Sequence, residues 1–260
     1  MNNEQNYINR PQFRRTRLLI GDENFKELNN SFVVVVGLGA VGGYAAEALA
    51  RSGVGRIRVV DFDTVCETNI NRQIYALHST IGRHKAEVAA ERISQINPCC
   101  RVEPLTLFTE PQTIPKILDG HPDIIIDAID SLNPKVELLA QGRAAGLTIL
   151  SSMGAALRLD VSEIQIASLN DTKYCPLARL VRKRLRRRGA DTNITCVYSK
   201  EPTYKTSIKK NKQQNPLTVG GKKGRPRDIM GSLPTVPGIF GLILANEAIK
   251  ILSGLNTMTK

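Results

Sequence analysis

The sequence predicts an α/β fold, in which a mostly parallel β-sheet carries helices on both faces. One observation is the order in residues 32–63, where a β-branched run, a glycine-rich turn, a helical stretch and a second β-branched run follow one another. Another is that apolar runs such as residues 32–36 are too short for helices and suit strands buried on both faces. With 260 residues, 42% of them hydrophobic, one such domain with an elaborated end is expected rather than two equal domains.

The segment before the first strand carries arginines. Residues 1–12 are polar and predicted to be disordered. Arg14, Arg15 and Arg17 then precede a short apolar patch, and residues 22–30 have the composition of a helix that leads into the first strand. Taken alone, such cations are typical of a solvated surface.

The glycine-rich turn reads Gly37-Leu-Gly39-Ala-Val-Gly42. Gly37 suits a tight turn, Gly39 lets a ligand approach the backbone, and Gly42 lets the following helix pack close to the strand. The amides at that helix N-terminus favour an anion such as a nucleotide phosphate. Asp61, 19 residues after Gly42, stands where a carboxylate accepts hydrogen bonds from a ribose. The order predicts a nucleotide site, against the alternative that these glycines serve packing alone.

A polar segment follows the second strand. Residues 65–73 show no helical or alternating period, which is typical of a loop that holds ligand groups. Within it, Asn69 and Arg72 have the chemistry to contact phosphate oxygens. Residues 81–85 are predicted to open a helix that runs to about residue 96, and Lys85 lies in its first turn, where a cation gains nothing from the helix dipole. A bound anion would explain that placement.

The next buried strand ends in acids. Residues 124–130 read IIIDAID, and an acid after a parallel strand lies on the same rim of the sheet as Gly37 and Asp61. Asp130 could hold the magnesium that accompanies a nucleoside triphosphate. The alternative is that Asp130 caps a helix that starts near Pro134. The remaining predicted elements are strands over residues 101–106, 147–151, 164–167 and 194–198 and helices over residues 114–118, 134–146 and 239–252.

The positive charge lies in the last third of the chain. The net charge of +12 divides into −2 for residues 1–170 and +14 for residues 171–260. Residues 177–188 form an amphipathic helix with seven basic side chains and no acid to balance them, which favours contact with a polyanion (RNA, DNA or anionic lipid) over a merely solvated face. Those seven are Arg179, Arg182, Lys183, Arg184, Arg186, Arg187 and Arg188. Residues 205–230 read as a flexible basic loop that orders on a partner.

Apolar runs and cysteine usage indicate the cellular compartment of the protein. No uninterrupted apolar run approaches the roughly 18 residues of a membrane span, and the N-terminal stretch has no apolar signal core. The five cysteines form no CxxC pair, which fits a reducing compartment and argues against zinc. We therefore expect a cytoplasmic protein without stable membrane insertion.

The residues beyond the glycine turn decide between nucleotide chemistries. The turn and Asp61 alone would equally suit a dehydrogenase that binds NAD. Asn69, Arg72, Lys85 and Asp130 are more than a dinucleotide needs, and they suit adenylation. In that reaction a carboxylate attacks the α-phosphorus of ATP, and fixed cations and magnesium meet the charge on the phosphates.

At these residues the chain resembles the E1-like (ubiquitin-activating-like, ThiF/MoeB-type) adenylating enzymes. The motifs are GLGAVG, the DFD of residues 61–63, TNINRQ, GRHK and IDAIDS. The resemblance implies a Rossmann-like E1 adenylation fold that binds ATP and Mg²⁺. It also implies a homodimer in which Arg15 reaches the phosphates of the neighbouring subunit. The positions that it assigns to nucleotide contacts are Gly37, Gly39, Ala40, Gly42, Asp61, Asp63, Asn69, Arg72 and Lys85, with Asp130 on the magnesium and Arg15, Arg72, Lys85 and Asp130 in catalysis. Ala40 replaces a glycine that is common in the family, which leaves the backbone amide in place.

Within that family the likeness is closest to the tRNA threonylcarbamoyladenosine dehydratase group. The motifs are FRRTRLLIG, TNINRQIYAL, QINP, DAIDS, SSMGA, CPLARLVRKRLRRRG and VYSKEP. This likeness implies that ATP activates the carboxylate of threonylcarbamoyladenosine in tRNA and that the carbamoyl group then closes a ring and expels AMP. No enzyme cysteine is needed, because the internal nucleophile is already tethered.

Two other functions remain open at this point. One is adenylation of the C-terminus of a ubiquitin-like or sulfur-carrier protein, although the CxxC motifs of its sulfur-carrier members are absent. Cys196 could then accept a thioester or sulfur, but a buried strand cysteine is the simpler interpretation. The other is a nucleotide-regulated RNA- or membrane-binding module without turnover. A sulfur-relay partner stays open as well. The expected organisation is an ATP-binding domain over residues 13–170, a basic substrate-binding elaboration over residues 171–232 and a closing helix within residues 233–260.

Overall fold

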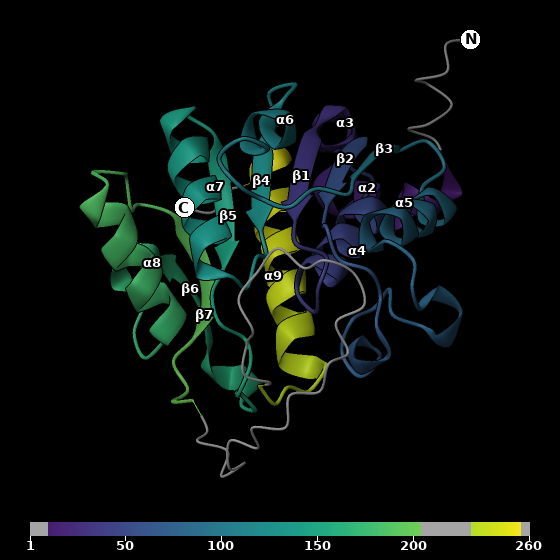
Figure 1. Ribbon diagram of the computed structural model, residues 1–260. Coiled ribbons are helices and arrows are strands. Elements are labelled where there is room, and N and C mark those ends of the chain that lie inside the picture. The colour runs from purple at the N-terminus through teal and green to yellow at the C-terminus, as the bar shows by residue number, and fades with distance from the viewer. Residues whose placement is uncertain (1–9, 204–229, 256–260) are drawn as a thin grey trace.

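A seven-stranded sheet forms the middle layer of the computed structural model, which describes residues 10–203 and 230–255 (Figure 1). Its strand order is β3-β2-β1-β4-β5-β7-β6, and all pairs are parallel except β6 with β7. The predicted mostly parallel α/β sheet is thereby confirmed. The strands are β1 (Phe32–Val36), β2 (Arg56–Val60), β3 (Arg101–Leu105), β4 (Ile124–Asp127), β5 (Thr148–Ser152), β6 (Ile164–Ser168) and β7 (Thr195–Ser199). The α-helices are α2 (Arg14–Ile20), α3 (Asp22–Asn30), α4 (Gly42–Ser52), α5 (Lys85–Ile96), α6 (Ile114–Leu118), α7 (Leu132–Ala144), α8 (Pro176–Arg187) and α9 (Thr235–Leu252). Short 3-10 turns lie at Pro11–Phe13, Glu67–Asn69, His78–Thr80, Val161–Glu163 and Leu169–Asp171.

Both faces of the sheet are covered by helices. All five residues of β1 are buried, as the continuous β-branched run predicts. Val33 and Val35 pack into a core with residues of α3, α4, α5 and α9. Val34 and Val36 point to the other face, into a second core with residues of α6, α7 and α8. Strand alternation thus divides the helices between two layers around one sheet.

The register of the central strands brings the predicted site residues to one rim. Val36 lies opposite Val60 on β2 and opposite Asp127 on β4. The next residue of each strand therefore leaves the sheet at the same level, and the Gly37 amide still donates to the Val60 carbonyl at 2.8 Å. This carboxyl rim is where open parallel sheets gather ligands.

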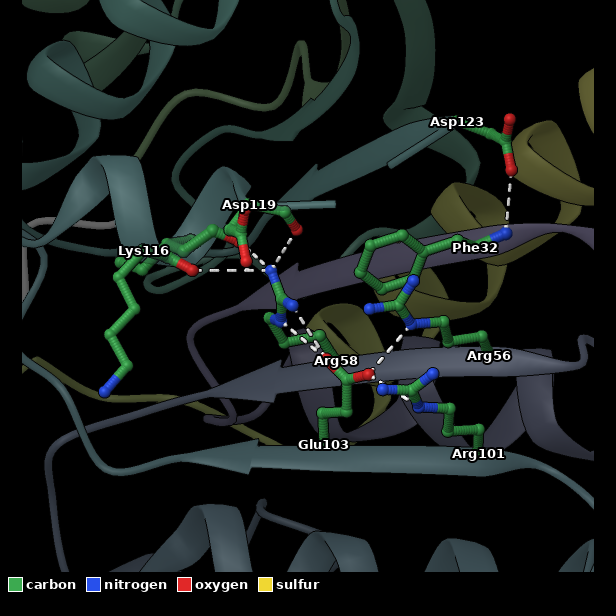
Figure 2. A network of polar contacts seen from close by, with 9 residues as sticks. Phe32, Arg56, Arg58, Arg101, Glu103, Lys116, Asp119 and Asp123 are labelled. Atoms are coloured by element: carbon green, nitrogen blue, oxygen red, sulfur yellow. Dashed lines mark hydrogen bonds and ion pairs between the residues drawn. The ribbon is translucent and has the colours of Figure 1, made fainter. Parts of the chain in front are cut away.

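The opposite rim is held by an ion-pair network around Glu103 (Figure 2). Its carboxylate accepts hydrogen bonds from Arg56 (2.8 Å) and Arg58 (2.7 and 3.0 Å) and pairs with Arg101. Arg58 also donates to the carbonyls of Ile117 (2.9 Å) and Asp119 (2.6 Å), which ties the end of α6 to β2. These residues have structural partners at the rim away from the glycine turn.

Several boundaries differ from the sequence prediction. Helix α7 begins at Leu132, two residues before Pro134, and α9 begins at Thr235 rather than at Ile239. In both helices a proline lies in the first turn, where its missing amide would have no helical partner. Strand β7 lies between β5 and β6, so the chain after residue 170 continues the same sheet.

Helix α9 is 18 residues long and, among the described helices, it alone is long and apolar enough to span a membrane by length and composition. Val236, Phe240, Leu244, Ala245 and Ala248 are buried in the core shared with α4. Such burial is typical of the core helix of a folded domain. Of the segment predicted to be disordered (residues 1–12), residues 1–9 lie outside the described residues, and Pro11–Phe13 form a short 3-10 turn. Residues 205–229 of the predicted flexible loop (residues 205–230) also lie outside them.

Candidate nucleotide-binding site

The glycine turn has the close contacts that its pattern predicts. Gly37 has a φ of 90°, and a Cβ there would lie 2.8 Å from the Ala128 carbonyl oxygen. A Cβ on Gly42 would lie 1.8 Å from the Gly37 carbonyl oxygen, which no side chain can meet without a shift of the backbone. At Gly39 the nearest atom is a side-chain nitrogen at 3.8 Å, so this glycine is not required by protein packing. Space above Gly39 is what close approach of a ligand requires.

The turn opens α4 without a side-chain cap. Val41 occupies the N-cap position, and within the described parts of the chain no side chain accepts a hydrogen bond there. Ala40 is partly buried beside it. Backbone amides at an uncapped helix N-terminus, together with the helix dipole, form an anion site.

Asp61 connects the second strand to the turn. Its Oδ2 accepts a hydrogen bond from the Leu38 amide at 2.7 Å, and its Oδ1 accepts one from the Asp63 amide at 2.8 Å. Burial raises the pKa of Asp61 above its ordinary value, and Lys85 and the two amides oppose that rise. Each carboxylate oxygen keeps a lone pair for a further donor. Asp61 therefore positions the turn as well as offering an acceptor, and the first of these roles was missed from the sequence.

Lys85 lies between the acids at this rim. It lies in the first turn of α5, as predicted, and is the residue at which that helix begins; its side chain is 7% exposed. Its Nζ is 3.3 Å from Oδ2 of Asp63, and its amide donates to the Asp63 carbonyl at 3.0 Å. A cation held at the start of a helix beside the glycine turn adds to the anion-binding potential of the rim.

The loop of Asn69 and Arg72 is folded on itself. Asn69 Oδ1 accepts from the Cys66 amide at 3.2 Å. Arg72 Nη1 donates to the Thr68 carbonyl at 2.9 Å and to Asn71 Oδ1 at 2.8 Å. The side chains of Asn69 and Arg72, which are both predicted to contact phosphate, are thus held by hydrogen bonds within the loop. Arg72 is partly exposed.

Asp130 is exposed and lies on the loop between β4 and α7. Ala128, on the same loop, contacts the glycine turn, because its carbonyl oxygen is the atom that a Cβ at Gly37 would meet at 2.8 Å. The N-cap of α7 is Ser131, and among the described residues no side chain caps that helix. The alternative that Asp130 caps it is therefore not supported. No group of three or more His, Cys, Asp or Glu residues in the described parts of the chain could hold a metal. One exposed carboxylate still fits Mg²⁺, which commonly uses one or two carboxylates together with substrate phosphates.

A buried charge pair beneath this loop was not predicted. Lys135 and Asp127 are both fully buried, with Nζ 2.5 Å from Oδ2, and Ser151 Oγ donates to the same carboxylate oxygen at 2.6 Å. Asp127 Oδ1 also accepts from the Ile129 amide at 3.1 Å. This network holds the backbone that leads to Asp130. The sequence contains no signal for it, because lysines are rarely fully buried.

In the described part of the chain, some basic side chains of residues 179–188 have hydrogen-bond partners within the protein and others do not. Arg182 donates to the Leu169 carbonyl at 2.7 Å and to Thr172 Oγ1 at 2.9 Å, so it fixes the preceding loop. Three further arginines bond to side chains elsewhere: Arg184 to Asn133, Arg186 to Asn170 and Arg188 to Glu137. Within residues 10–203 and 230–255 the remaining three have no hydrogen-bond or ion-pair partner, and all three are exposed: Arg179, Lys183 and Arg187.

The sequence also singles out Cys196 and Arg15, and the structure describes both. Cys196 is fully buried on β7, as a strand cysteine should be, and burial raises its pKa to about 12. All five cysteines are free. Arg15 is exposed on α2, and in the described part of the chain it has no hydrogen bond or ion pair.

The model of the ThiF family matches residues 13–260. This chain belongs to the ThiF family. It is 38% identical to the tRNA threonylcarbamoyladenosine dehydratase of Bacillus subtilis over 240 residues, which cover 92% of this chain and 93% of that protein. It is 36% identical to the dehydratase of the same name from Escherichia coli, with 93% of each covered. The crystal structure of the E. coli dehydratase in complex with ATP matches with a TM-score of 0.82 at 33% identity and covers 96% of each chain, and a structure in complex with AMP matches equally.

The two glycines of the turn predict different effects of the same substitution. Gly42→Ala should lower the free energy of unfolding by about 3 kcal/mol or more, because its Cβ meets the Gly37 carbonyl. Gly39→Ala should change it by less than about 0.5 kcal/mol. Urea unfolding of the two variants measures the contrast, and equal stabilities would contradict the packing argument.

Proposed function

We propose that this ThiF-family protein catalyses the ATP-dependent dehydration of threonylcarbamoyladenosine in tRNA to its cyclic form. The observation that carries the proposal is the likeness, at 36–38% identity over more than nine-tenths of both chains, to dehydratases that are named for this substrate. The rim described above supplies an independent chemical reason, because it combines a helix N-terminus, fixed cations and carboxylates.

ATP would lie over the glycine turn. In this arrangement Gly37, Gly39, Ala40 and Gly42 place backbone amides near the phosphates, and Asp61 accepts the ribose hydroxyls. Lys85 and Arg72, with Asn69, would contact phosphate oxygens, and Asp63 holds Lys85 in place through the 3.3 Å ion pair. The complexes of the E. coli relative with ATP and AMP support nucleotide binding by this fold.

Asp130 is the residue we assign to Mg²⁺. It is exposed beside the turn, and its backbone is fixed by the Asp127–Lys135 network. When bound with ATP, the ion would neutralise charge on the phosphates. Lys85 and Arg72 would share that task, since pyrophosphate leaves with its full negative charge.

The reaction then proceeds in two displacements. A carboxylate oxygen of the threonyl group attacks the α-phosphorus, the bond to pyrophosphate breaks, and an acyl adenylate forms. The carbamoyl group of the same nucleoside next attacks the activated carbonyl, loses a proton and expels AMP. The product has lost one water relative to the substrate, and the oxygen leaves in AMP. Because the second nucleophile is tethered, Cys196 need take no part.

The tRNA would dock along α8. Arg179, Lys183 and Arg187 recur at every fourth residue, so they form one stripe on the helix surface. Phosphate contacts by such cations position RNA without reading its sequence. A tRNA substrate also fits a cytoplasmic protein.

We also propose a homodimer in which Arg15 completes the partner's phosphate site. Leu18 and Leu19 on α2 are 78% and 85% exposed, next to the exposed Arg15. Exposed leucines side by side are typical of a covered surface. A shared α2 surface would bury them and carry Arg15 toward the neighbouring rim.

The first test is mass spectrometry of nucleosides from threonylcarbamoylated tRNA incubated with the protein, ATP and Mg²⁺. We expect loss of one water from the modified adenosine, dependent on ATP and matched by AMP. Lys85→Ala or Arg72→Ala should lower this rate by about 100-fold or more and leave tRNA affinity within about twofold, since both residues lie on the phosphate side. Lys116→Ala, on the opposite rim, is the control. Unchanged tRNA with intact ATP binding would instead favour a carrier-protein substrate, and RNA binding regulated by ATP without turnover would favour a binding module.

The division of cations on α8 predicts unequal effects on tRNA binding. Replacing Arg179, Lys183 and Arg187 together by Gln should weaken binding and reduce the slope of log affinity against log salt by about 2–3. The matched triple replacement of Arg184, Arg186 and Arg188 should have a smaller effect on the slope, because these side chains already have protein partners. Fluorescence anisotropy at several salt concentrations measures both. Equal slopes for the two variants would contradict the assignment of Arg179, Lys183 and Arg187 as the tRNA contacts.

Sharing of residues between subunits predicts complementation. Arg15→Ala and Lys85→Ala should each be inactive alone, but a mixed dimer has one site with both residues intact. After random exchange of equal amounts, activity should return to about a quarter of the wild-type value. Failure of the mixture to recover activity, with subunit exchange verified by mass spectrometry, would place Arg15 outside the partner's site.

A further inference from the structure

Arg158 is the largest fully buried side chain of the described residues, and most of its hydrogen-bonding capacity is unused. It follows β5 on the loop at the carboxyl rim and is 2% exposed. Its Nη2 donates to the Tyr174 carbonyl at 3.2 Å. Its Nε and Nη1 have no hydrogen-bond partner among the residues that the structure describes. Buried guanidinium donors without a partner are costly, which indicates a group reserved for a ligand.

The neighbouring carboxylate of Glu201 does not satisfy Nε and Nη1 of Arg158. Glu201 accepts hydrogen bonds from the amides of Leu159 and Asp160, both at 2.9 Å, so it holds the backbone of this loop. Burial lowers the pKa of Arg158, and the neighbouring Cys175 and Glu201 only oppose that shift. The loop therefore fixes the guanidinium in place and leaves a direct anionic contact to be supplied from elsewhere.

The backbone on both sides of the guanidinium is strained. Leu157 and Tyr174, which are not glycines, have φ values of 60° and 56°. Positive φ values at such residues cost free energy and cluster where a site is held in a required geometry. Leu157 precedes Arg158 in the chain, and the Tyr174 carbonyl accepts the hydrogen bond from Arg158 Nη2. Two strained positions thus converge on one cation.

Arg158 lies next to the loop that carries Arg72. The Leu157 amide donates to the Gly231 carbonyl at 3.0 Å, and Asn71 Nδ2 donates to the carbonyl of the next residue, Ser232, at 3.1 Å. Asn71 in turn accepts from Arg72. One short segment therefore joins the loop of Arg158 to the predicted phosphate loop.

The other side of Arg158 borders the basic helix. Tyr174 and Cys175 line a cavity of about 490 Å³ that also contacts Arg179 and Arg182. These two arginines line the neighbouring groove of about 450 Å³ along α8 as well. The two cavities thus share Arg179 and Arg182, and Tyr174, which is 70% exposed, lines the one nearer Arg158 and accepts its hydrogen bond.

We propose that Arg158 binds the carboxylate of the threonylcarbamoyl group on the substrate adenosine. The inference rests on the proposed function and adds the residue that recognises the reacting group. A guanidinium pairs with a carboxylate through directional, charge-assisted hydrogen bonds, which Nε and Nη1 are free to make. Its position between α8 and the loop of Arg72 matches a nucleoside whose tRNA lies on α8 and whose carboxylate must meet the α-phosphorus.

The experiment compares the affinities of threonylcarbamoylated and unmodified tRNA, measured without ATP so that no turnover occurs. Wild-type protein should prefer the modified tRNA by about 10- to 100-fold. Arg158→Gln should abolish that preference and leave affinity for unmodified tRNA unchanged, and Arg158→Lys should retain part of it. Arg179→Gln is the matched control, because loss of a phosphate contact should weaken both tRNAs equally. ATP affinity reports whether each variant is folded.

The outcomes separate this assignment from the proposed function. A wild-type protein that fails to dehydrate the modified tRNA overturns the function itself. An active wild-type protein whose Arg158→Gln variant keeps the preference overturns only the role of Arg158. Equal weakening of both tRNAs by Arg158→Gln would assign a backbone phosphate to Arg158 and also overturn the carboxylate assignment.

A measurement on the wild-type protein tests the proposal even if the Arg158 variants fail to fold. Hydrogen exchange of the amides in residues 157–160 should slow more with modified than with unmodified tRNA, because only the modified nucleoside brings the carboxylate to this loop. Equal protection by the two tRNAs would overturn the proposal.

Discussion

The hydrogen bond from the Leu38 amide to Asp61 is the contact on which the carboxyl rim depends. Leu38 follows the first glycine of the turn, and Asp61 is the residue after β2. The amide nitrogen lies 2.7 Å from Oδ2, and the contact is buried. The same turn must pass beneath Ala128 and beside the start of α4, where no Cβ fits at Gly37 or Gly42. Charge and sterics therefore fix one backbone path, and that path decides where α4 directs its amides. Lys85, Asp63 and the loop of Arg72 are arranged around it.

The sequence predicted those parts of the fold that depend on local pattern. The β-branched run of β1, the close packing at the glycines and the place of Lys85 in the first turn of α5 are confirmed, because strand period, steric need and helix placement can be read from single segments. The partner of Lys135 was not readable, since its burial against Asp127 depends on how α7 packs on the sheet. The same applies to α8, where the count of cations was plain but their separation into bonded and free side chains required tertiary neighbours. The roles of the site residues toward ATP and tRNA stay predictions.

Strong charges in this protein have two distinct environments. At the rim near Glu103, Arg58 is buried against a carboxylate and backbone carbonyls (Figure 2). Under Asp130, Lys135 is buried against Asp127 in the same way, so both cations maintain the shape of the molecule. On α8 the exposed side chains of Arg179, Lys183 and Arg187 have no ion-pair partner within the described chain, so their field extends into solvent. Arg158 shares a property with each group. It is buried like the first, and its Nε and Nη1 have no hydrogen-bond partner among the described residues, which resembles the second.

The place of β7 in the sheet has a consequence for how the chain assembles during synthesis. Among the described strands β7 is made last, yet it lies between β5 and β6, so β6 has no neighbour in the described sheet until residue 199 has been added. Strands β1 to β5 can pair beforehand, and they include the glycine turn. A chain that stops before β7 would therefore expose the open edge of β5, and exposed strand edges recruit other chains. Truncation or slow translation within residues 176–199 should thus cause aggregation rather than a simple loss of substrate binding.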